Sequence, residues 1–259
     1  MIKKHDICRV ASLEPLAKDT YALTLKVNGD MLKYFRPGQF AHIRLPHAGE
    51  HLLRRPISVN TIDREAETMR FAFLIQGEGT RRLSQCRPGD ELDILAPLGQ
   101  GFRVKESHQK IWLVGGGIGI APLLSLRDTV PGREYTAFLG YKSREYAYER
   151  KEFEGFCKAV HVTSDDGSIG EKNFVTEALR RELEKEKPDV ILSCGPLPMF
   201  RSLKRVWEED GRDVETQVSM EQHMGCGTGG CYTCTCMVAG AMKRVCMDGP
   251  VFDIREVKL

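Results

Sequence analysis

The sequence lacks any run of apolar residues long enough to cross a membrane, because no window reaches the roughly 18 residues that a spanning helix needs. A secretory leader is not expected either, since charges interrupt the first residues and no apolar stretch follows them. A large excess of charge of one sign is also missing, because 38 Lys and Arg stand against 36 Asp and Glu. Nucleic acids are bound by clustered basic faces, and the basic doublets here are scattered. We therefore expect a cytoplasmic protein whose partners include neither a membrane nor nucleic acid.

Catalytic side-chain sets are missing as well. The seven histidines are spread along the chain, and no Ser/His/Asp or Cys/His arrangement suggests hydrolysis. We predict no catalytic residue, so any chemistry depends on bound groups. His223 is interpreted as a surface or packing residue. Cysteine, in contrast, is abundant: nine thiols in a chain without a leader indicate a reducing compartment, where thiols bind metal or stay free.

The strongest chemical signal is a cysteine pattern near the carboxyl end, C-x4-C-x2-C-x11-C. It consists of Cys226, Cys231, Cys234 and Cys246, and glycines at 225, 227, 229 and 230 allow a tight loop. The spacing is that of plant-type [2Fe–2S] sites. Zinc sites usually offer two separated pairs, so zinc is the less favoured alternative, and a disulfide framework is less favoured still. Cys236 is interpreted as a packed bystander, although it could replace Cys234 if the loop were threaded differently.

The amino-terminal part of the chain, residues 7–103, has the pattern of short strands separated by turns. Alternating or apolar segments lie at Tyr21–Val27, Gln39–Leu45 and Met69–Ile75, with Gly and Pro between them. Strands of this length and spacing predict a small antiparallel barrel.

From Ile111 onward the pattern predicts a parallel α/β sheet, because short apolar strands alternate with helical segments. The predicted strands are Ile111–Val114, Tyr135–Leu139, Ala159–Thr163 and Val190–Cys194, and the predicted helices are Glu149–Lys158, Lys172–Lys187 and Met199–Asp210. After Val218 helical periodicity disappears while glycine and cysteine become frequent. We therefore predict a multidomain protein with a β-barrel at 1–104, an α/β domain at 105–216 and a small cluster domain at 217–259.

The predicted barrel contains a pair of candidate anion-binding segments. In Arg55-Pro56-Ile57-Ser58 a guanidinium and a hydroxyl flank a proline of fixed φ, which suits a pyrophosphate. In Gly77-Glu78-Gly79-Thr80 a flexible turn precedes an expected helix start at Arg81 and can aim N–H groups at phosphate. Taken singly, each pattern is equally typical of a solvated strand end or an ordinary hairpin turn.

The α/β part contains a glycine run at a position where nucleotides bind. Gly115, Gly116, Gly117 and Gly119 follow an apolar strand and open a predicted helix, although Ile120 stands where the third glycine of the full dinucleotide fingerprint belongs. A tight turn without a ligand is the alternative. A second strand ends in Cys194-Gly195-Pro196, and Cys194 lies either beside a nicotinamide or in the core as a small hydrophobe.

Taken together, these segments resemble the ferredoxin–NADP reductase superfamily and, within it, the electron-transfer subunits of class 1B dihydroorotate dehydrogenases. The resemblance extends over essentially the whole chain and is most specific at Met224 through Cys234 and at Cys246 through Phe252. It implies an FAD-binding barrel, an NAD-binding α/β domain and a C-terminal [2Fe–2S] domain. It assigns FAD to Arg55–Ser58, Gly79 and Thr80, with Ala72-Phe73-Leu74 lying along the flavin.

The resemblance also implies a function. Electrons from a separate FMN-containing subunit, which oxidises dihydroorotate in pyrimidine (UMP) biosynthesis, enter at the cluster, pass to FAD and leave as hydride to NAD⁺. A flavin stands between the other centres because it exchanges both one and two electrons. The expected assembly contains two copies of each chain.

The nicotinamide preference is predicted from Asp165. NADP-specific members of the superfamily carry a Ser-Arg pair after the corresponding strand, whereas Ser164 is followed here by Asp165. A carboxylate repels a 2′-phosphate and can accept from a free ribose hydroxyl, so NAD is favoured. Asp165 could instead cap a turn, and Ser143-Arg144 leaves room for NADP.

Two alternative functions remain open. The chain could be the NAD(P)H-oxidising subunit of a sulfide dehydrogenase, a bifurcating transhydrogenase or a hydrogenase. Related subunits there can carry Asp at the first cluster position, so Cys226 favours the dihydroorotate complex. It could also be a non-catalytic redox sensor, which would lack tightly bound FAD.

Overall fold

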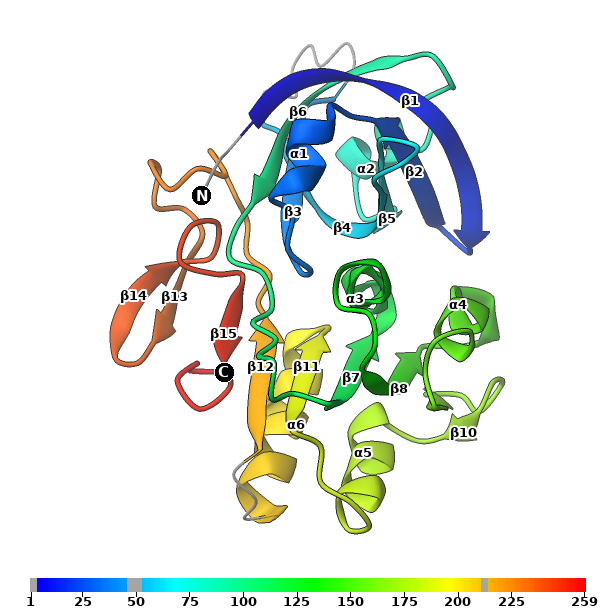
Figure 1. Cartoon of the computed structure of the whole chain (residues 1–259), viewed down its shortest axis with the longest axis vertical. Helices are drawn as coiled ribbons and strands as arrows, with labels where there is room; N and C mark the ends of the chain where they lie inside the picture. Colours follow the sequence, from blue (N-terminus) through cyan, green and yellow to red (C-terminus); the bar gives the residue numbers. More distant parts are fainter. Residues whose placement is uncertain (1–3, 46–52, 211–213) are drawn as a thin grey trace.

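The computed structural model describes residues 4–45, 53–210 and 214–259. Figure 1 shows an antiparallel barrel at the top, a mainly parallel sheet below it, and a C-terminal segment that runs beside both. The architecture is the predicted combination of a β-barrel, a parallel α/β sheet and a small carboxyl-terminal unit.

The barrel closes in the strand order β1-β2-β5-β4-β3-β6, and neighbouring strands are antiparallel. Its elements are β1 (Lys4–Ala17), β2 (Thr20–Lys26), α1 (Gly29–Lys33), β3 (Phe40–Ile43), β4 (Arg55–Asp63), β5 (Thr68–Leu74), α2 (Glu78–Leu83) and β6 (Glu91–Leu98). The long β1 was not among the predicted strands. Only Cys8 and Val10 are buried along it, so the sequence carries little period-two signal there.

The second sheet has the order β10-β9-β8-β7-β11-β12-β15. Its strands are β7 (Lys110–Gly116), β8 (Glu134–Tyr141), β9 (Ala159–Ser164), β10 (Glu171–Lys172), β11 (Val190–Cys194), β12 (Glu215–Ser219) and β15 (Val251–Asp253). The strands from β10 to β12 run parallel, whereas β15 pairs antiparallel with β12. The strong apolar runs at β7 and β11 reflect burial on both faces.

Helices pack against both faces of this sheet. They are η1 (Gly117–Leu124), α3 (Ser125–Thr129), η2 (Arg144–Tyr146), α4 (Arg150–Glu154), α5 (Val175–Leu183) and α6 (Leu197–Asp210). The predicted helix over 149–158 is shorter because Gly155, a poor helix former, caps it. The glycine run does not open a regular α-helix as predicted: a 3-10 turn containing Pro122 comes first.

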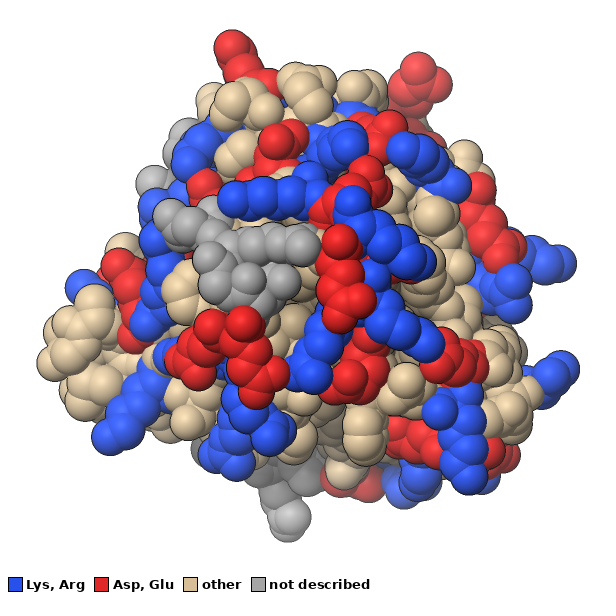
Figure 2. All heavy atoms as spheres, turned by 90° about the horizontal axis from the view of Figure 1, so that it is seen from below, with Lys and Arg blue, Asp and Glu red and all other residues tan. Residues whose placement is uncertain are grey.

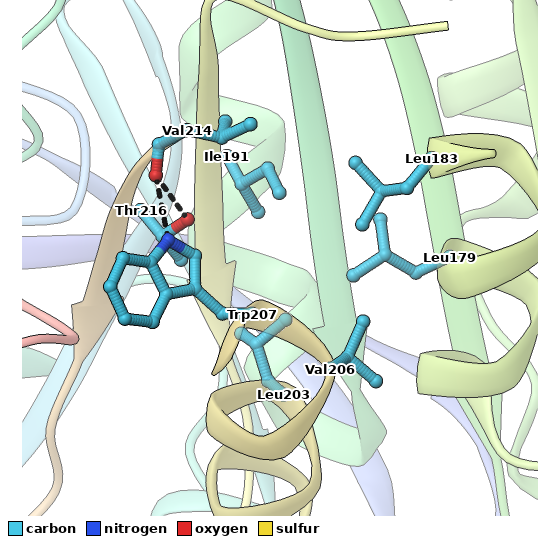
Figure 3. Close-up of a pocket in the computed structure, with 8 residues that line it drawn as sticks. All are labelled: Leu179, Leu183, Ile191, Leu203, Val206, Trp207, Val214 and Thr216. Atoms are coloured by element: carbon cyan, nitrogen blue, oxygen red, sulfur yellow. Dashed lines mark hydrogen bonds between the residues drawn. The ribbon is translucent and has the colours of Figure 1, made fainter. Parts of the chain in front are cut away.

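Packing of α5 and α6 against the sheet is apolar. Figure 3 shows Leu179 and Leu183 of α5 and Leu203 and Val206 of α6 around Ile191 of β11. At the edge of this core the Trp207 indole N–H donates to the Val214 carbonyl at 3.1 Å, and the Thr216 hydroxyl donates to the same oxygen at 3.1 Å. These bonds fix the end of α6 against the entrance to β12.

The C-terminal segment contains the hairpin β13 (Thr235–Val238) and β14 (Ala241–Arg244) and then returns to the main sheet through β15. The predicted boundary between residues 216 and 217 falls inside β12, and β15 from the cluster region extends the same sheet. The division into domains stays a prediction, because β15 of the predicted cluster domain is a strand of the sheet of the predicted α/β domain.

The short strand β3 joins the barrel to the C-terminal unit. Its residues are all buried, and they alternate between two cores. Ala41 and Ile43 point into the barrel interior, whereas Phe40 packs with Leu98, Cys234 and Cys246 outside it. The outer face of β3 is therefore covered by the cysteine-rich segment.

Lys and Arg alternate with Asp and Glu over the face drawn in Figure 2, so this face offers no continuous basic surface. In the parts of the chain that the structure describes, no helix is long and apolar enough to cross a membrane.

Candidate metal centre and nucleotide sites

The cysteines of the C-terminal pattern form two pairs in the structure. The backbone N–H of Cys226 lies 3.4 Å from Cys231 Sγ, and the N–H of Cys231 lies 3.4 Å from Cys226 Sγ. The N–H of Cys246 donates to Cys234 Sγ at 3.4 Å. The first pair is partly or fully exposed, whereas the second is buried.

The spacing of the second pair follows from local chain geometry. The eleven residues between Cys234 and Cys246 are the two strands of the β13–β14 hairpin, its turn and Val245, whose N–H donates to the Cys234 carbonyl at 2.8 Å. The turn residues Ala239 and Gly240 have φ of 49° and 74°. Positive φ at both positions is typical of the type I′ turn that matches strand twist. The hairpin thus carries Cys246 back to Cys234.

Hydrogen bonds to sulfur prepare the first pair for ligation. Burial opposes the effect, but N–H donors from Thr228 and Cys231 prevail and lower the pKa of Cys226 to about 6. The Thr233 hydroxyl donates to Cys231 Sγ at 3.2 Å and lowers the pKa of Cys231. Burial and the neighbouring Cys234 raise the pKa of Cys246 to about 12. Since the thiolate is the metal ligand, the first pair is already poised to bind.

This pairing fits a two-iron cluster better than zinc. Each iron of a [2Fe–2S] cluster takes two protein thiolates, whereas a structural zinc needs four donors around one point. Within the described ranges, no three Cys, His, Asp or Glu side chains gather closely enough to hold a single ion. Cys236 lies on β13 and packs half-buried against the core that contains Cys234 and Cys246, in keeping with its interpretation as a packed bystander.

The structure brings together the two candidate anion-binding segments of the barrel. Arg55 begins β4, and its guanidinium lies over Gly79, where an added Cβ would stand only 2.0 Å from Arg55 Nε. The predicted helix start at Arg81 is wrong, because α2 begins at Glu78. The reason is a cap: Thr80 Oγ1 accepts from the N–H groups of Gln76 and Gly77 at 2.9 and 3.3 Å.

The segment predicted to lie along the flavin alternates between two faces. Ala72 contributes to the core that contains Ile120 and Ala121 of η1, whereas Phe73 packs inside the barrel, with its ring 6.1 Å from that of Tyr21. Leu74 is half-buried. A flavin placed along β5 would therefore meet Ala72, Leu74 and backbone, but not the Phe73 ring.

The predicted nicotinamide segments also converge. Cys194 pairs in register with Gly115 on neighbouring parallel strands. An added Cβ at Gly119 would stand 2.4 Å from the Cys194 carbonyl oxygen, and one at Gly116 would stand 3.2 Å from Pro196 Cδ. The two turns therefore touch at the carboxyl edge of the sheet, where ligands of such sheets collect. Burial raises the pKa of Cys194 to about 12, so its thiol is a neutral, packed group.

Asp165 lies at the same edge, at the end of β9. Its N–H donates to the Tyr141 carbonyl at 3.2 Å and its side chain is exposed. Nearby, the Arg144 backbone donates to the Ser168 hydroxyl at 2.7 Å and its Nε to the Ser168 carbonyl at 2.9 Å. These hydrogen bonds join the loop after β8 to the loop after β9. The joined loops carry the Asp165 carboxylate and the Arg144 guanidinium.

Sequence reasoning missed His42. This side chain is fully buried on the outer face of β3, and neither ring nitrogen has a hydrogen-bond partner among the described residues. Burial and, after it, the positive charge of Arg54 lower the pKa of His42 to about 4, although a contact with the Cys226 backbone acts in the opposite direction, so the ring is neutral. A histidine within an otherwise apolar strand, Phe40–Ile43, was the available signal.

Sequence reasoning also missed a polar network between the barrel and the α/β unit. Glu149, whose side chain is 1% exposed, pairs with Arg70 of β5. Asn60 of β4 donates to Glu149 Oε2 at 3.0 Å and to the Ala121 carbonyl at 2.9 Å. Glu149 stands at φ 56° just before α4. Next to it, the Tyr148 hydroxyl lies 3.2 Å from the Gly117 and Ile118 carbonyls. The network thus ties the glycine turn to the barrel.

Comparisons with known proteins agree with this organisation. Residues 221–258 match the family model described as "Iron-sulfur cluster binding domain of dihydroorotate dehydrogenase B", and residues 113–205 match "Oxidoreductase NAD-binding domain". The chain is 38% identical over 268 residues, covering 100% of both chains, to "Dihydroorotate dehydrogenase B (NAD(+)), electron transfer subunit" of Shouchella clausii (strain KSM-K16).

Solved structures share the fold. The structure of an NADH-dependent reduced ferredoxin-NADP oxidoreductase, described for flavin-based electron bifurcation, is similar with a TM-score of 0.87 and 32% identity over 98% of this chain and 90% of that chain. A ferredoxin NADP+ reductase from Neisseria gonorrhoeae, solved with bound FAD and NADP, has a TM-score of 0.67 at 16% identity, covering 80% of this chain and 92% of that chain, and shows the fold alone.

Barrel, sheet and paired thiols therefore define an oxidoreductase of the ferredoxin–NADP reductase fold that carries a C-terminal iron–sulfur domain. An identity of 38% to a curated relative over the full length of both chains then narrows this class to one family. The chain belongs to the family of dihydroorotate dehydrogenase B electron transfer subunits.

Proposed function

We propose that this chain is the electron-transfer subunit of an NAD-linked dihydroorotate dehydrogenase of pyrimidine biosynthesis. It takes electrons from an FMN-containing subunit that oxidises dihydroorotate and passes them through a [2Fe–2S] cluster and FAD to NAD⁺. The observation that carries the proposal is the pairing of Cys226 with Cys231 and of Cys234 with Cys246, directly against the outer face of the barrel.

The chain's own residues bind and orient the groups that do the chemistry. A flavin held on the barrel supplies the exchange between hydride and single electrons that joins the other two centres. Arg55, stacked on Gly79, supplies a bidentate donor for the FAD diphosphate. The touching turns at Gly115–Gly119 and Cys194–Pro196 offer backbone donors to the nicotinamide nucleotide. No side chain has to transfer a proton.

NAD is the proposed acceptor. The exposed Asp165 carboxylate can accept from a ribose hydroxyl and repels a 2′-phosphate. Arg144, the residue that left room for NADP, directs its Nε to the Ser168 carbonyl at 2.9 Å, which positions it against the neighbouring loop.

We further propose a cytoplasmic assembly of two such chains with two FMN subunits. None of the nine cysteines, all of which lie in the described ranges, forms a disulfide, which fits a reducing compartment. The exposed Cys231 and Tyr232 place one edge of the cluster loop within reach of a partner.

The decisive experiment is affinity purification of the tagged chain from cells that express its natural partner. We expect an FMN-containing subunit to co-purify, the complex to reduce NAD⁺ with dihydroorotate, and the Cys231→Ser complex to lose this activity. A partner that instead reduces ferredoxin or NADP⁺ would favour the function suggested by the bifurcating relative. A purified chain without flavin or iron would contradict both.

A further inference from the structure

His42 occupies the contact between the barrel and the cluster loop. It follows Phe40 on the outer face of β3, and its side chain is 0% exposed. Neither ring nitrogen, Nδ1 or Nε2, makes a hydrogen bond of good geometry among the described residues, although the ring lies close enough to the Cys226 backbone for that group to raise its pKa against the larger effect of burial. A polar ring is therefore held in a fully buried position that an apolar ring, like the neighbouring Phe40, could fill.

The strands of the barrel fix the position of His42. His42 pairs in register with Pro56 on β4 and with Leu95 on β6, so its backbone lies within the barrel wall. Arg54 directs Nη1 toward the His42 carbonyl at 3.4 Å and donates from Nη2 to Asp93 Oδ2 at 2.6 Å. The strand ladder thus holds the ring on the side of β3 that faces the cluster loop.

The cluster loop packs directly against the His42 ring. An added Cβ at Gly227 would stand 2.4 Å from His42 Nδ1, and Gly227 has a φ of 67°. Only glycine satisfies both the left-handed backbone and this close approach. Gly227 directly follows Cys226, so Nδ1 faces the loop at its first thiol ligand.

Leaving a ring unpaired here is costly. A neutral imidazole has one N–H donor and one bare nitrogen, and a buried donor or acceptor without a partner loses the hydrogen bond that it makes with water in the unfolded chain. A buried polar group without a well-formed hydrogen bond needs an explanation, and a group bound beside it is one. The donor set around the site, two thiol pairs, is that of a [2Fe–2S] cluster, whose sulfurs accept hydrogen bonds.

We propose that His42 is a positioning residue for the iron–sulfur cluster. Its Nδ1–H donates to the cysteine-rich loop at Cys226, the first thiol ligand. Hydrogen bonds to cluster sulfurs stabilise the reduced, more negative state and so raise the reduction potential. His42, a residue of the flavin-binding barrel, thereby raises the reduction potential of the cluster. The inference rests on the proposed cluster but not on the identity of the electron donor.

The first test compares His42→Phe, which fills the space without an N–H, with His42→Asn, whose amide can replace the Nδ1 donor. Purified proteins are titrated anaerobically, and the reduced cluster is followed by EPR. We expect His42→Phe to keep stoichiometric iron but to show a more negative midpoint potential and shifted g-values. His42→Asn is expected to return both toward the wild type. A His42→Phe protein with wild-type potential and g-values would overturn the proposal.

A second measurement needs no stable Phe variant. In wild-type protein labelled with ¹⁵N-histidine, pulsed EPR of the reduced cluster should show a histidine nitrogen coupling that is absent from labelled His42→Asn. This comparison separates His42 from His223, the other histidine near the loop in sequence. Absence of the coupling in the wild type would refute the role of His42, whereas absence of iron would instead contradict the proposed function.

Discussion

At the scale of single residues, the thiols of the cluster region differ in what they contact. Cys231 exchanges backbone-to-sulfur hydrogen bonds with Cys226 and receives one from Thr233. Cys236 makes no such contact with the pairs in the structure and packs as a half-buried hydrophobe on β13. We therefore leave Cys236 outside the proposed ligand set.

We predict that Cys231→Ser loses the cluster, whereas Cys236→Ser keeps it. Removing one thiolate from a pair leaves an iron with an incomplete sulfur shell, and cluster binding is coupled to folding of the loop. Iron content and the visible absorption of anaerobically purified protein measure the outcome. Loss of the absorption in Cys236→Ser would show that the ligand assignment is wrong.

A residue without a Cβ is needed at position 79, because the Arg55 side chain occupies the space that a Cβ would fill. We predict that Gly79→Ala displaces the guanidinium and reduces the FAD retained on purification, as Arg55→Ala also does. Gly77→Ala is the matched control, because nothing lies within 4 Å of its added Cβ and its φ of −170° suits any residue. Flavin-to-protein ratios measure the effect, and equal retention in all variants would remove Arg55 from the diphosphate site.

Asp165 is predicted to set nucleotide preference through its charge. Asp165→Arg should shift the ratio of kcat/KM values from NADH toward NADPH, because it replaces repulsion of the 2′-phosphate with attraction. Asp165→Asn is the control, in which discrimination falls but no new affinity for the phosphate is created. An unchanged ratio in both variants would place the ribose elsewhere.

At the scale of elements, the β13–β14 hairpin determines the geometry of the second thiol pair. Its two-residue turn needs a positive φ at Ala239 and Gly240, and its strands carry Cys246 back to Cys234. The C-terminal tail supports the hairpin, because the Ala239 N–H donates to the Glu256 carbonyl at 2.8 Å and the Lys258 N–H to the Met237 carbonyl at 3.0 Å. The turn is the point at which a single substitution strains the backbone between the two thiols of the pair.

We predict that Gly240→Val weakens cluster retention. Left-handed backbone costs a residue with a Cβ about 1–2 kcal/mol, and a β-branched side chain is disfavoured further. Faster loss of iron to a chelator, compared with the wild type, measures the effect. Met242→Ala on the same hairpin is the control, since that side chain is 60% exposed, and it should release iron at the wild-type rate. Equal rates in all proteins would contradict the role of the turn.

At the scale of the whole molecule, the proposed cofactor sites lie on separate units that contact one another. Phe40 and His42 of β3 lie against the cluster loop, and Arg70 and Asn60 of the barrel hold Glu149 beside the glycine turn. The barrel therefore contacts both the cysteine-rich loop and the glycine turn, which are the proposed cluster and nucleotide sites.

We predict that Glu149→Ala destabilises the protein by on the order of 3 kcal/mol, because it leaves Arg70 partly buried without its carboxylate. The shift of the urea midpoint, followed by Trp fluorescence, measures the loss. Arg150→Ala is the control: its pair with Glu154 is exposed and should contribute less than about 1 kcal/mol. Similar midpoints for both variants would show that the network does not stabilise the contact between the units.

The sequence by itself determined the elements whose causes are local. Apolar runs at β7 and β11 identified the parallel sheet, since both faces of those strands are buried. The cysteine spacing identified the cluster because loop and hairpin lengths are set by nearby residues. Only tertiary structure decided that His42 meets Gly227, that Arg70 meets Glu149 and that β15 completes the main sheet. These partners lie far apart along the chain, and no periodicity or spacing records a contact that exists only after the units have packed.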